Sequence, residues 1–274
     1  DVGHLVHGQM PQPPEEGIRI LLDPNCDPLE SIELPPGLIP LDSVELEEIL
    51  GHVLENSRSY NHWPVAINHA SATNLLALRV VGDDLPPLEL VTQAMNGEFV
   101  PTRVVLVLEE KSQLDLLQVV LGSGNSAHSH LLEIYLGKGS ELTHGWLALG
   151  GGDGNLMAHL NVEQQPYSNY QLTGIQQGWL LGRFEPRVVQ VSGNASTTLR
   201  GLQVSTGLEQ FGTYSRVRFD GPEGCLDQLN KSVAKDSSHC IFEGAVQVPR
   251  SAQRTNASQL SRNLLLSSRS RIDT

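Results

Sequence analysis

Short apolar or alternating runs recur about every 8–14 residues from residue 102 to the end of the chain. They cover Val104–Leu108, Leu116–Leu121, Leu131–Leu136, Leu142–Leu149, Leu156–Glu163, Tyr170–Leu181, Arg187–Ser192, Thr198–Ser205, Tyr214–Phe219, His239–Val248 and Leu260–Leu266. The alternation in Leu156–Glu163 is strict, with apolar residues at even positions and mostly polar residues at odd positions. A period of two places these sets on opposite faces of a strand. The pattern predicts a series of short β-strands and no helix between 102 and 274.

Regular short strands are typical of a β-sandwich, a β-barrel or a β-solenoid. The turns between them are polar, as in Gly122–Asn125, Gly150–Gly154 and Gly193–Asn194, while aliphatic residues fill the strands. Successive coils of a solenoid bury such aliphatic residues against one another. On spacing alone, a solenoid and a sandwich are about equally favoured.

The first hundred residues follow a different pattern. Residues 1–40 are rich in proline and acidic residues, with one short apolar run at Ile18–Leu22, so we expect no helix there. Apolar residues recur at helical spacing from 44 to 54, after a capping-box sequence at 42–45. We predict a helix over Ser43–Glu55 and a second short helix near Ala72–Leu78. These patterns divide the chain into residues 1–101 and 102–274.

The net charge of −13 is unevenly distributed. Residues 1–100 hold 16 Asp or Glu against 3 Lys or Arg, and residues 101–249 hold 14 against 10. Residues 250–274 hold one acid against five arginines. Nucleic-acid binding needs a dominant basic face, and this short basic tail does not supply one. We therefore expect no nucleic-acid partner.

Neither a membrane span nor a secretion signal is expected. No apolar run approaches the roughly 20 residues that cross a bilayer, and residues 1–10 lack the basic and apolar segments of a signal peptide. The three cysteines are odd in number and far apart, which favours a reducing, cytosol-like compartment.

The C-terminal part carries a longer motif. Residues 252–267 read AQRTNASQLSRNLLLS, RIDT follows at 271–274, and FEGAVQV precedes at 242–248. Together with Gly201-Leu202 and Gly182-Arg183, these segments resemble the core signature of the SufB/SufD family, scaffold proteins of the SUF iron–sulfur cluster assembly system. The RNLLLS form is more similar to the SufD branch than to the SufB branch, whose corresponding stretch carries a cysteine. The resemblance is strongest over 200–274 and weakens toward the N-terminus.

This resemblance implies a mainly β protein, with a right-handed parallel β-helix over 102–274 after a smaller mixed α/β region over 1–101. It implies a SufD-like, non-enzymatic scaffold subunit that pairs with SufB and the ATPase SufC in a bacterial cytosol or plastid stroma. In the family, more β-helix and a helical region that docks SufC follow the Ile-Asp-Thr segment. We therefore expect a truncated scaffold and carry over no metal ligand. A cluster is expected only transiently, in the complex.

One adjacent histidine–cysteine pair and one separate cysteine invite a metal-binding interpretation. Imidazole and thiolate are natural iron ligands, and His239 and Cys240 are adjacent. Strand neighbours point to opposite faces, however, and Cys240 shares parity with Phe242, so we interpret Cys240 as an inward structural residue. Cys225 follows a Gly-Pro-Glu-Gly turn and is expected to be exposed and a poor cluster ligand.

Further histidines lie within or between the predicted strands. His128 and His130 have a spacing that binds zinc or iron, with Glu133 or His144 to supply a third ligand. We favour a polar turn between coils. His144 and His159 lie in strand-like runs and are interpreted as half-buried structural histidines, because no nucleophile is spaced to partner them.

The remaining motifs have structural interpretations. Gly150–Asn155 lacks the ending of a phosphate-binding loop and is interpreted as a turn. The polar residues of the signature are expected to form side-chain ladders along a solenoid: Gln253, Asn256, Gln259, Arg262 and Asn263. No catalytic residue is predicted.

A scaffold subunit is therefore the favoured function. Its last coil would pair with SufB, or with a second copy when the protein is alone. One alternative is a β-helix enzyme acting on polysaccharide, although the strand region holds few paired acids. The other is a purely structural solenoid.

Overall fold

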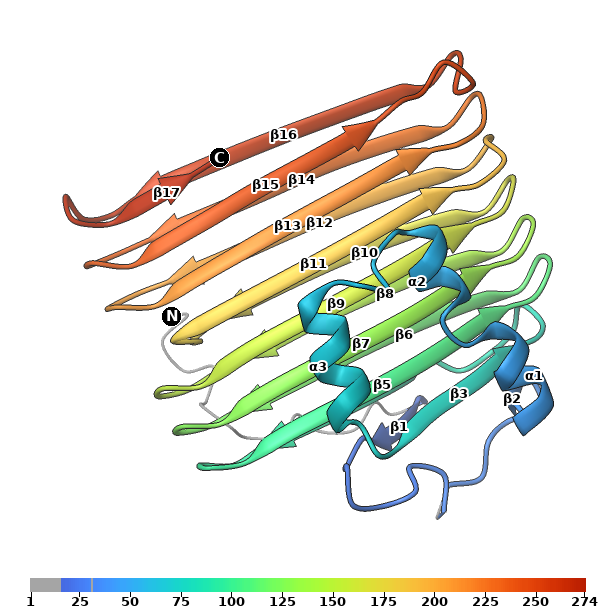
Figure 1. Ribbon diagram of the computed structural model, residues 1–274, viewed down its shortest axis with the longest axis horizontal. Helices are drawn as coiled ribbons and strands as arrows, with labels where there is room; N and C mark the ends of the chain where they lie inside the picture. Colours follow the sequence, from blue (N-terminus) through green and yellow to red (C-terminus); the bar gives the residue numbers. More distant parts are fainter. Residues whose placement is uncertain (1–15, 31) are drawn as a thin grey trace.

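The chain winds between two β-sheets as a parallel solenoid of about seven turns (Figure 1). The computed structural model describes residues 16–30 and 32–274. Over these residues the first sheet contains, in spatial order, β1 (Ile18–Leu21), β4 (Leu88–Ala94), β6 (Gln113–Gly122), β8 (Glu141–Leu149), β10 (Asn169–Gln177), β12 (Ser196–Ser205), β14 (Cys225–Ala234) and β16 (Asn256–Leu265). We call it sheet A.

The second sheet, sheet B, contains the other described strands. In spatial order they are β17 (Arg271–Asp273), β15 (His239–Gln247), β13 (Gln210–Phe219), β11 (Leu181–Gln190), β9 (Asn155–Gln164), β7 (Ala127–Leu136), β5 (Phe99–Leu108), β3 (Leu75–Val80) and β2 (Leu38–Pro40). All neighbouring strands pair in parallel except β2 and β3. The parallel β-helix predicted from the resemblance is confirmed, and the sandwich is not.

Parallel register stacks the inward residues of successive coils. An apolar row crosses β5, β7, β9, β11 and β13, and every member is buried: Leu106, Ile134, Val162, Val188 and Val217. Such rows remove apolar surface from water along the length of the solenoid.

The interior becomes polar in the C-terminal coils. Strand β14 turns Gln228, Asn230 and Ser232 inward, where all three are buried. Their amides and hydroxyls bond one another and the facing strands, as in Gln228 Nε2 to Ser215 Oγ at 2.7 Å. This strand is absent from the predicted series, because its inward side lacks the apolar run on which that prediction depends.

Three helices cover part of the outer face of sheet B, and α2 and α3 contact β5, β7 and β9 (Figure 1). They are α1 (Ser43–Ile49), α2 (His52–Asn56) and α3 (Trp63–Ser71). The capping box at Asp42 and Glu45 is confirmed. The single helix predicted over Ser43–Glu55 is wrong in one respect: Leu50 is extended and Gly51 adopts a left-handed conformation, with φ of 86°, so the segment forms two helices.

The helix predicted near Ala72–Leu78 is wrong. Residues 75–80 form β3, because parallel pairing with β5 outweighs the weak helical pattern. The helix lies just upstream, as α3, with Pro64 in its first turn. The expected division at 101/102 falls inside β5, and parallel pairing extends upstream of it to β1, β3 and β4. Pro101 is tolerated because β3 pairs with β5 only from Arg103 onward.

Candidate functional site

The outer face of β9 holds a row of buried polar side chains beneath the N-terminal helices. His159, Asn161 and Glu163 lie on the face opposite the apolar row, as the strict alternation predicts, and none is more than 2% exposed. Asn161 Oδ1 accepts hydrogen bonds from Ser57 Oγ at 2.8 Å and Ser59 Oγ at 2.7 Å. Glu163 accepts one from Asn56 Nδ2 at 2.5 Å. This row joins the helical region to the solenoid.

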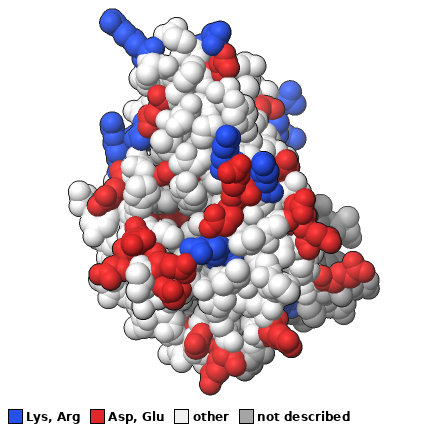
Figure 2. Space-filling view, turned by 90° about the vertical axis from the view of Figure 1, so that its right-hand side faces the viewer, with Lys and Arg blue, Asp and Glu red and all other residues white. Residues whose placement is uncertain are grey.

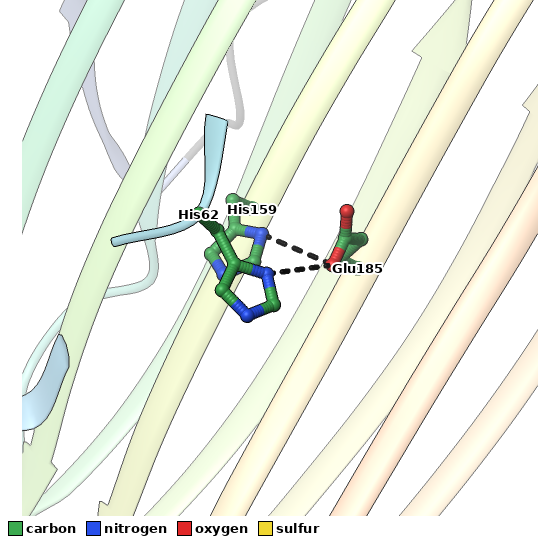
Figure 3. A group of neighbouring side chains, drawn as sticks. All are labelled: His62, His159 and Glu185. Carbon is green, nitrogen blue, oxygen red and sulfur yellow. Dashed lines mark ion pairs between the residues drawn. The ribbon is translucent and has the colours of Figure 1, made fainter. Parts of the chain in front are cut away.

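At His159 the row forms a cluster with His62 and Glu185 (Figure 3). Register places His159 on β9 beside Glu185 on β11, and the start of α3 brings His62 over both. The distance from His159 Nδ1 to Glu185 Oε2 is 3.5 Å, and that from His62 Nδ1 is 4.0 Å. His159 and Glu185 are almost completely buried, whereas His62 is partly exposed.

Two arginines hold the Glu185 carboxylate. Arg183 Nε donates to Oε1 at 2.5 Å, and Arg187 Nη2 donates to Oε2 at 3.2 Å. The same Arg187 Nη2 lies 3.0 Å from His62 Nδ1. Burial raises the pKa of Glu185, but the opposite effect of His159, Arg183 and Arg187 is larger. The pKa therefore lies below its ordinary value, and the carboxylate is ionised at neutral pH.

Both imidazoles of this cluster are neutral near pH 7. Burial lowers the pKa of His159 to about 3. The pKa of His62 is lowered first by burial and then by Arg187, which outweighs Glu185. Two neutral imidazoles and a carboxylate are the donor set of many transition-metal sites. A metal ion here would have to displace Arg187 from both His62 and Glu185.

The sequence patterns do not predict this cluster. They place His159 in a strand as a structural histidine, in agreement with the structure, but they single out neither His62 nor Glu185. The polar residues on the outer side of β9 are as buried as the apolar residues on its inner side, so another part of the chain must cover this face. Only the folded chain shows which residues do so.

The histidine pair of β7 lies inside the solenoid, so its interpretation as a polar turn is wrong. His128 and His130 share the inward side of the strand, and their rings stack with centroids 5.5 Å apart. His128 Nε2 bonds the Leu121 carbonyl at 3.1 Å, and His130 Nδ1 bonds Thr102 Oγ1. Burial lowers the pKa of His128 to about 4 and that of His130 well below its ordinary value.

The third ligands considered for that pair are engaged elsewhere. Glu133 lies on the outer face of β7, where it accepts hydrogen bonds from Arg103 and from the Gly51 backbone. His144 is buried in sheet A, with Nδ1 bonded to Tyr170 at 3.0 Å and Nε2 to Gln118 at 2.9 Å. His144 is fully buried, not half-buried as predicted, but these bonds agree with its interpretation as a structural histidine.

The cysteines lie apart from one another. Cys240 is buried and shares the inward side of β15 with Phe242, whereas His239 faces outward and bonds Asp273 at 2.9 Å. Burial raises the pKa of the Cys240 thiol. Cys225 is exposed, as expected, and so is Cys26. The Gly150–Asn155 run is the turn between β8 and β9.

The signature strand β16 is exposed along nearly its whole length. Gln259 lies in register with Gln228, the arrangement that an amide ladder needs, whereas Gln253 bonds the Arg250 carbonyl and Asn263 bonds Ser261. Asn256 and Arg262 are exposed. Beside Gln259, a cavity of about 660 Å³ opens between β15, β16 and β17.

Comparisons with known proteins agree with the motif on this strand. Residues 90–274 match the family described as SUF system FeS cluster assembly, SufBD core domain. The chain is 34% identical over 123 residues to the iron-sulfur cluster assembly SufBD family protein slr0076 of Synechocystis, covering 45% of this chain and 27% of that protein. It is 30% identical over 178 residues to the chloroplastic protein ABCI7 of Arabidopsis thaliana, covering 62% and 37% respectively. The chain thus spans less than half the length of either relative.

Proposed function

The chain belongs to the SufB/SufD family of the SUF iron–sulfur cluster assembly system, and we propose that it is a SufD-like scaffold subunit. In this proposal it catalyses no reaction itself. It pairs with a SufB-like subunit and works with the ATPase SufC, in a bacterial cytosol or plastid stroma. The iron–sulfur cluster is the cargo of the complex, held transiently at the subunit interface.

The observation that carries the pairing is the outer face of β16. Leu260 and Leu264 lie on that face, in register with Leu229 and Val233 of β14, and they are 46% and 53% exposed. Arg262 lies between them on the same face. Exposed apolar side chains beside an arginine are typical of protein–protein interfaces. We place the contact with the SufB-like subunit here.

Size-exclusion chromatography with light scattering tests this contact. The chain mixed with a SufB-like subunit and the ATPase should elute at the mass of a complex. The substitutions Leu260→Glu and Leu264→Glu should shift it back to separate components, because each buries a charge in an apolar contact. Leu21→Glu is the matched control, since Leu21 is 50% exposed on β1, at the opposite end of sheet A from β16, and should leave the complex intact. A chain that stays strictly monomeric beside the SufB-like subunit contradicts the proposal.

None of the described helices is long and apolar enough to cross a membrane.

A further inference from the structure

Four arginines converge on a small pocket between the outer face of sheet B and the turn after α2. Arg187, Arg216 and Arg218 come from β11 and β13, and Arg58 comes from the turn. The rest of the lining is Ser57, Val188, Val189 and Gln247. We call this the arginine pocket. Its cavity of about 10 Å³ admits one water-sized group.

The strand register forces like charges together in this pocket. Arg187 on β11 is directly opposite Arg216 on β13, with both side chains on the outer face. Like charges at opposite positions of neighbouring strands repel one another, so the pair needs a compensating negative group. Glu185 supplies part of it, but its carboxylate is already shared by Arg183 and Arg187.

Arg187 also has donors without partners. Its side chain is only 8% exposed, and its Nη2 serves both Glu185 and His62. Its Nε and Nη1 make no hydrogen bond. A guanidinium keeps its charge and its five donors at any ordinary pH, and buried donors are normally satisfied. These two nitrogens therefore mark the place of an acceptor.

The local charge balance is positive. Asp220 pairs with Arg218 through two bonds of 2.8 Å, whereas neither Arg58 nor Arg216 has an ion pair with any residue that the structure describes. At the edge of the pocket, burial, Arg187 and Arg216 lower the pKa of His62 despite the attraction of Glu185. This balance opposes a divalent cation on His62, His159 and Glu185 and favours an anion beside them.

We propose that the arginine pocket binds an oxyanion of the phosphate class, with one oxygen between Arg187 and Arg216 and the rest of the group at the mouth beside Arg58. Planar guanidinium forks match the oxygen geometry of phosphate. The bound anion would cross-link the N-terminal helices to sheet B. The site is independent of the subunit pairing proposed above.

Titration with inorganic phosphate at constant ionic strength tests the site, with calorimetry and thermal unfolding as readouts. We expect saturable binding and a rise in Tm that equivalent sodium chloride does not reproduce. Arg216→Gln and Arg58→Gln should each weaken binding about tenfold, since each removes a charged hydrogen bond. Arg58 is exposed, so its variant tests the site even if Arg216→Gln unfolds the chain. Arg269→Gln, at an exposed arginine in the turn between β16 and β17, is the matched control and should bind phosphate normally.

Parallel titrations with adenosine and ADP distinguish the source of the group. Tighter binding of ADP than of phosphate, with none of adenosine, assigns the site to the phosphate end of a larger molecule; equal binding assigns it to the free ion. Phosphate binding that is absent, or unchanged in both arginine variants, overturns the proposal. So does stoichiometric zinc binding that His62→Ala abolishes while phosphate has no effect.

Discussion

Asn161 shows how one side chain joins the two parts of the molecule. It is completely buried on the outer face of β9, and its Oδ1 accepts hydrogen bonds from both Ser57 and Ser59. Its Nδ2 reaches the Leu132 carbonyl at 3.4 Å. A single amide thus bonds the turn after α2 to two neighbouring strands of sheet B.

Replacing this amide should weaken the whole fold. We expect Asn161→Ala to lower the free energy of unfolding by about 1–3 kcal/mol, because the two serine hydroxyls lose their buried acceptor. Urea denaturation measures the change. Gln171→Ala, at an exposed position on sheet A, should change stability by less than about 0.5 kcal/mol. Equal losses in the two variants would show that Asn161 is not a structural link.

The buried histidines should make the fold sensitive to acid. His144 has a folded-state pKa of about 3, lowered by burial, against about 6.5 in the unfolded chain. The unfolded state therefore binds more protons below pH 6.5, and stability falls as the pH decreases from there toward 3. For His144 alone we expect a loss of about 2 kcal/mol between pH 7 and pH 5.

Denaturant unfolding of His144→Gln at the two pH values measures this contribution. The difference between pH 7 and pH 5 should shrink by about 2 kcal/mol relative to the parent. Thr197→Ala removes a buried, non-titrating group that bonds Gln164 and Gln190, so it should lower stability equally at both values. If His144→Gln keeps the full pH difference of the parent, the acid sensitivity arises elsewhere.

At the scale of elements, Gly51 sets the path of the N-terminal region. Helix α1 ends at Ile49 with Leu50 extended, and Gly51, with φ of 86°, is the N-cap of α2. The Gly51 N–H donates to Glu133 Oε2 at 2.8 Å. A Cβ at this position would meet Tyr60 at an ordinary 3.5 Å, so conformation rather than crowding requires glycine. The break turns α2 toward the outer face of sheet B.

Two substitutions at Gly51 separate these effects. Gly51→Ala should cost about 1 kcal/mol or more, because alanine disfavours the left-handed region. Gly51→Asn should cost less, since asparagine enters this region more readily. Thermal unfolding compares the two variants. Equal losses of stability would show that contacts of the added side-chain atoms, and not the backbone conformation, cause the destabilisation.

The elements also show what sequence patterns can and cannot predict. Strict alternation in Leu156–Glu163 predicts the inward and outward sides of β9 correctly, and parity predicts the buried Cys240. The pattern omits β14 because polar Gln228, Asn230 and Ser232 face inward there. It also misplaces His128 and His130, which are polar residues inside the core. Alternation predicts which side of a strand faces the interior only where that interior is apolar. It does not predict the partners of His159, because these depend on the register between β9 and β11 and on the position of α3.

At the scale of the molecule, charge follows the solenoid axis. On the face shown in Figure 2, acidic side chains gather over the lower part, and most Lys and Arg side chains lie over the upper part. The sequence has the same order, from −13 over residues 1–100 to +4 over residues 250–274. An uneven charge of this kind orients a charged partner during encounter. A partner that covers β16 would meet the basic end.

The positions of the cysteines determine how the chain can take part in cluster assembly. Cys225 begins β14 and Cys240 lies near the start of β15, so the ten-residue strand β14 separates them by about 30 Å. Cys240 is also buried, and Cys26 lies before β2. Iron–sulfur clusters are held by several ligands within a few ångströms of one another. These three thiols cannot meet around one cluster.

Anaerobic reconstitution with iron and sulfide therefore has a definite expected outcome. The chain alone should retain no ultraviolet–visible bands of a cluster after desalting, whereas the same chain with a SufB-like subunit and the ATPase should develop them. Cys26→Ser and Cys225→Ser should leave the bands of the complex unchanged, since neither thiol belongs to a group of three or more His, Cys, Asp or Glu ligands among the described residues. Retained bands on the chain alone would place a complete ligand set within this subunit. The subunit would then be a carrier of clusters in its own right, and its pairing with a SufB-like partner would serve transfer instead of assembly.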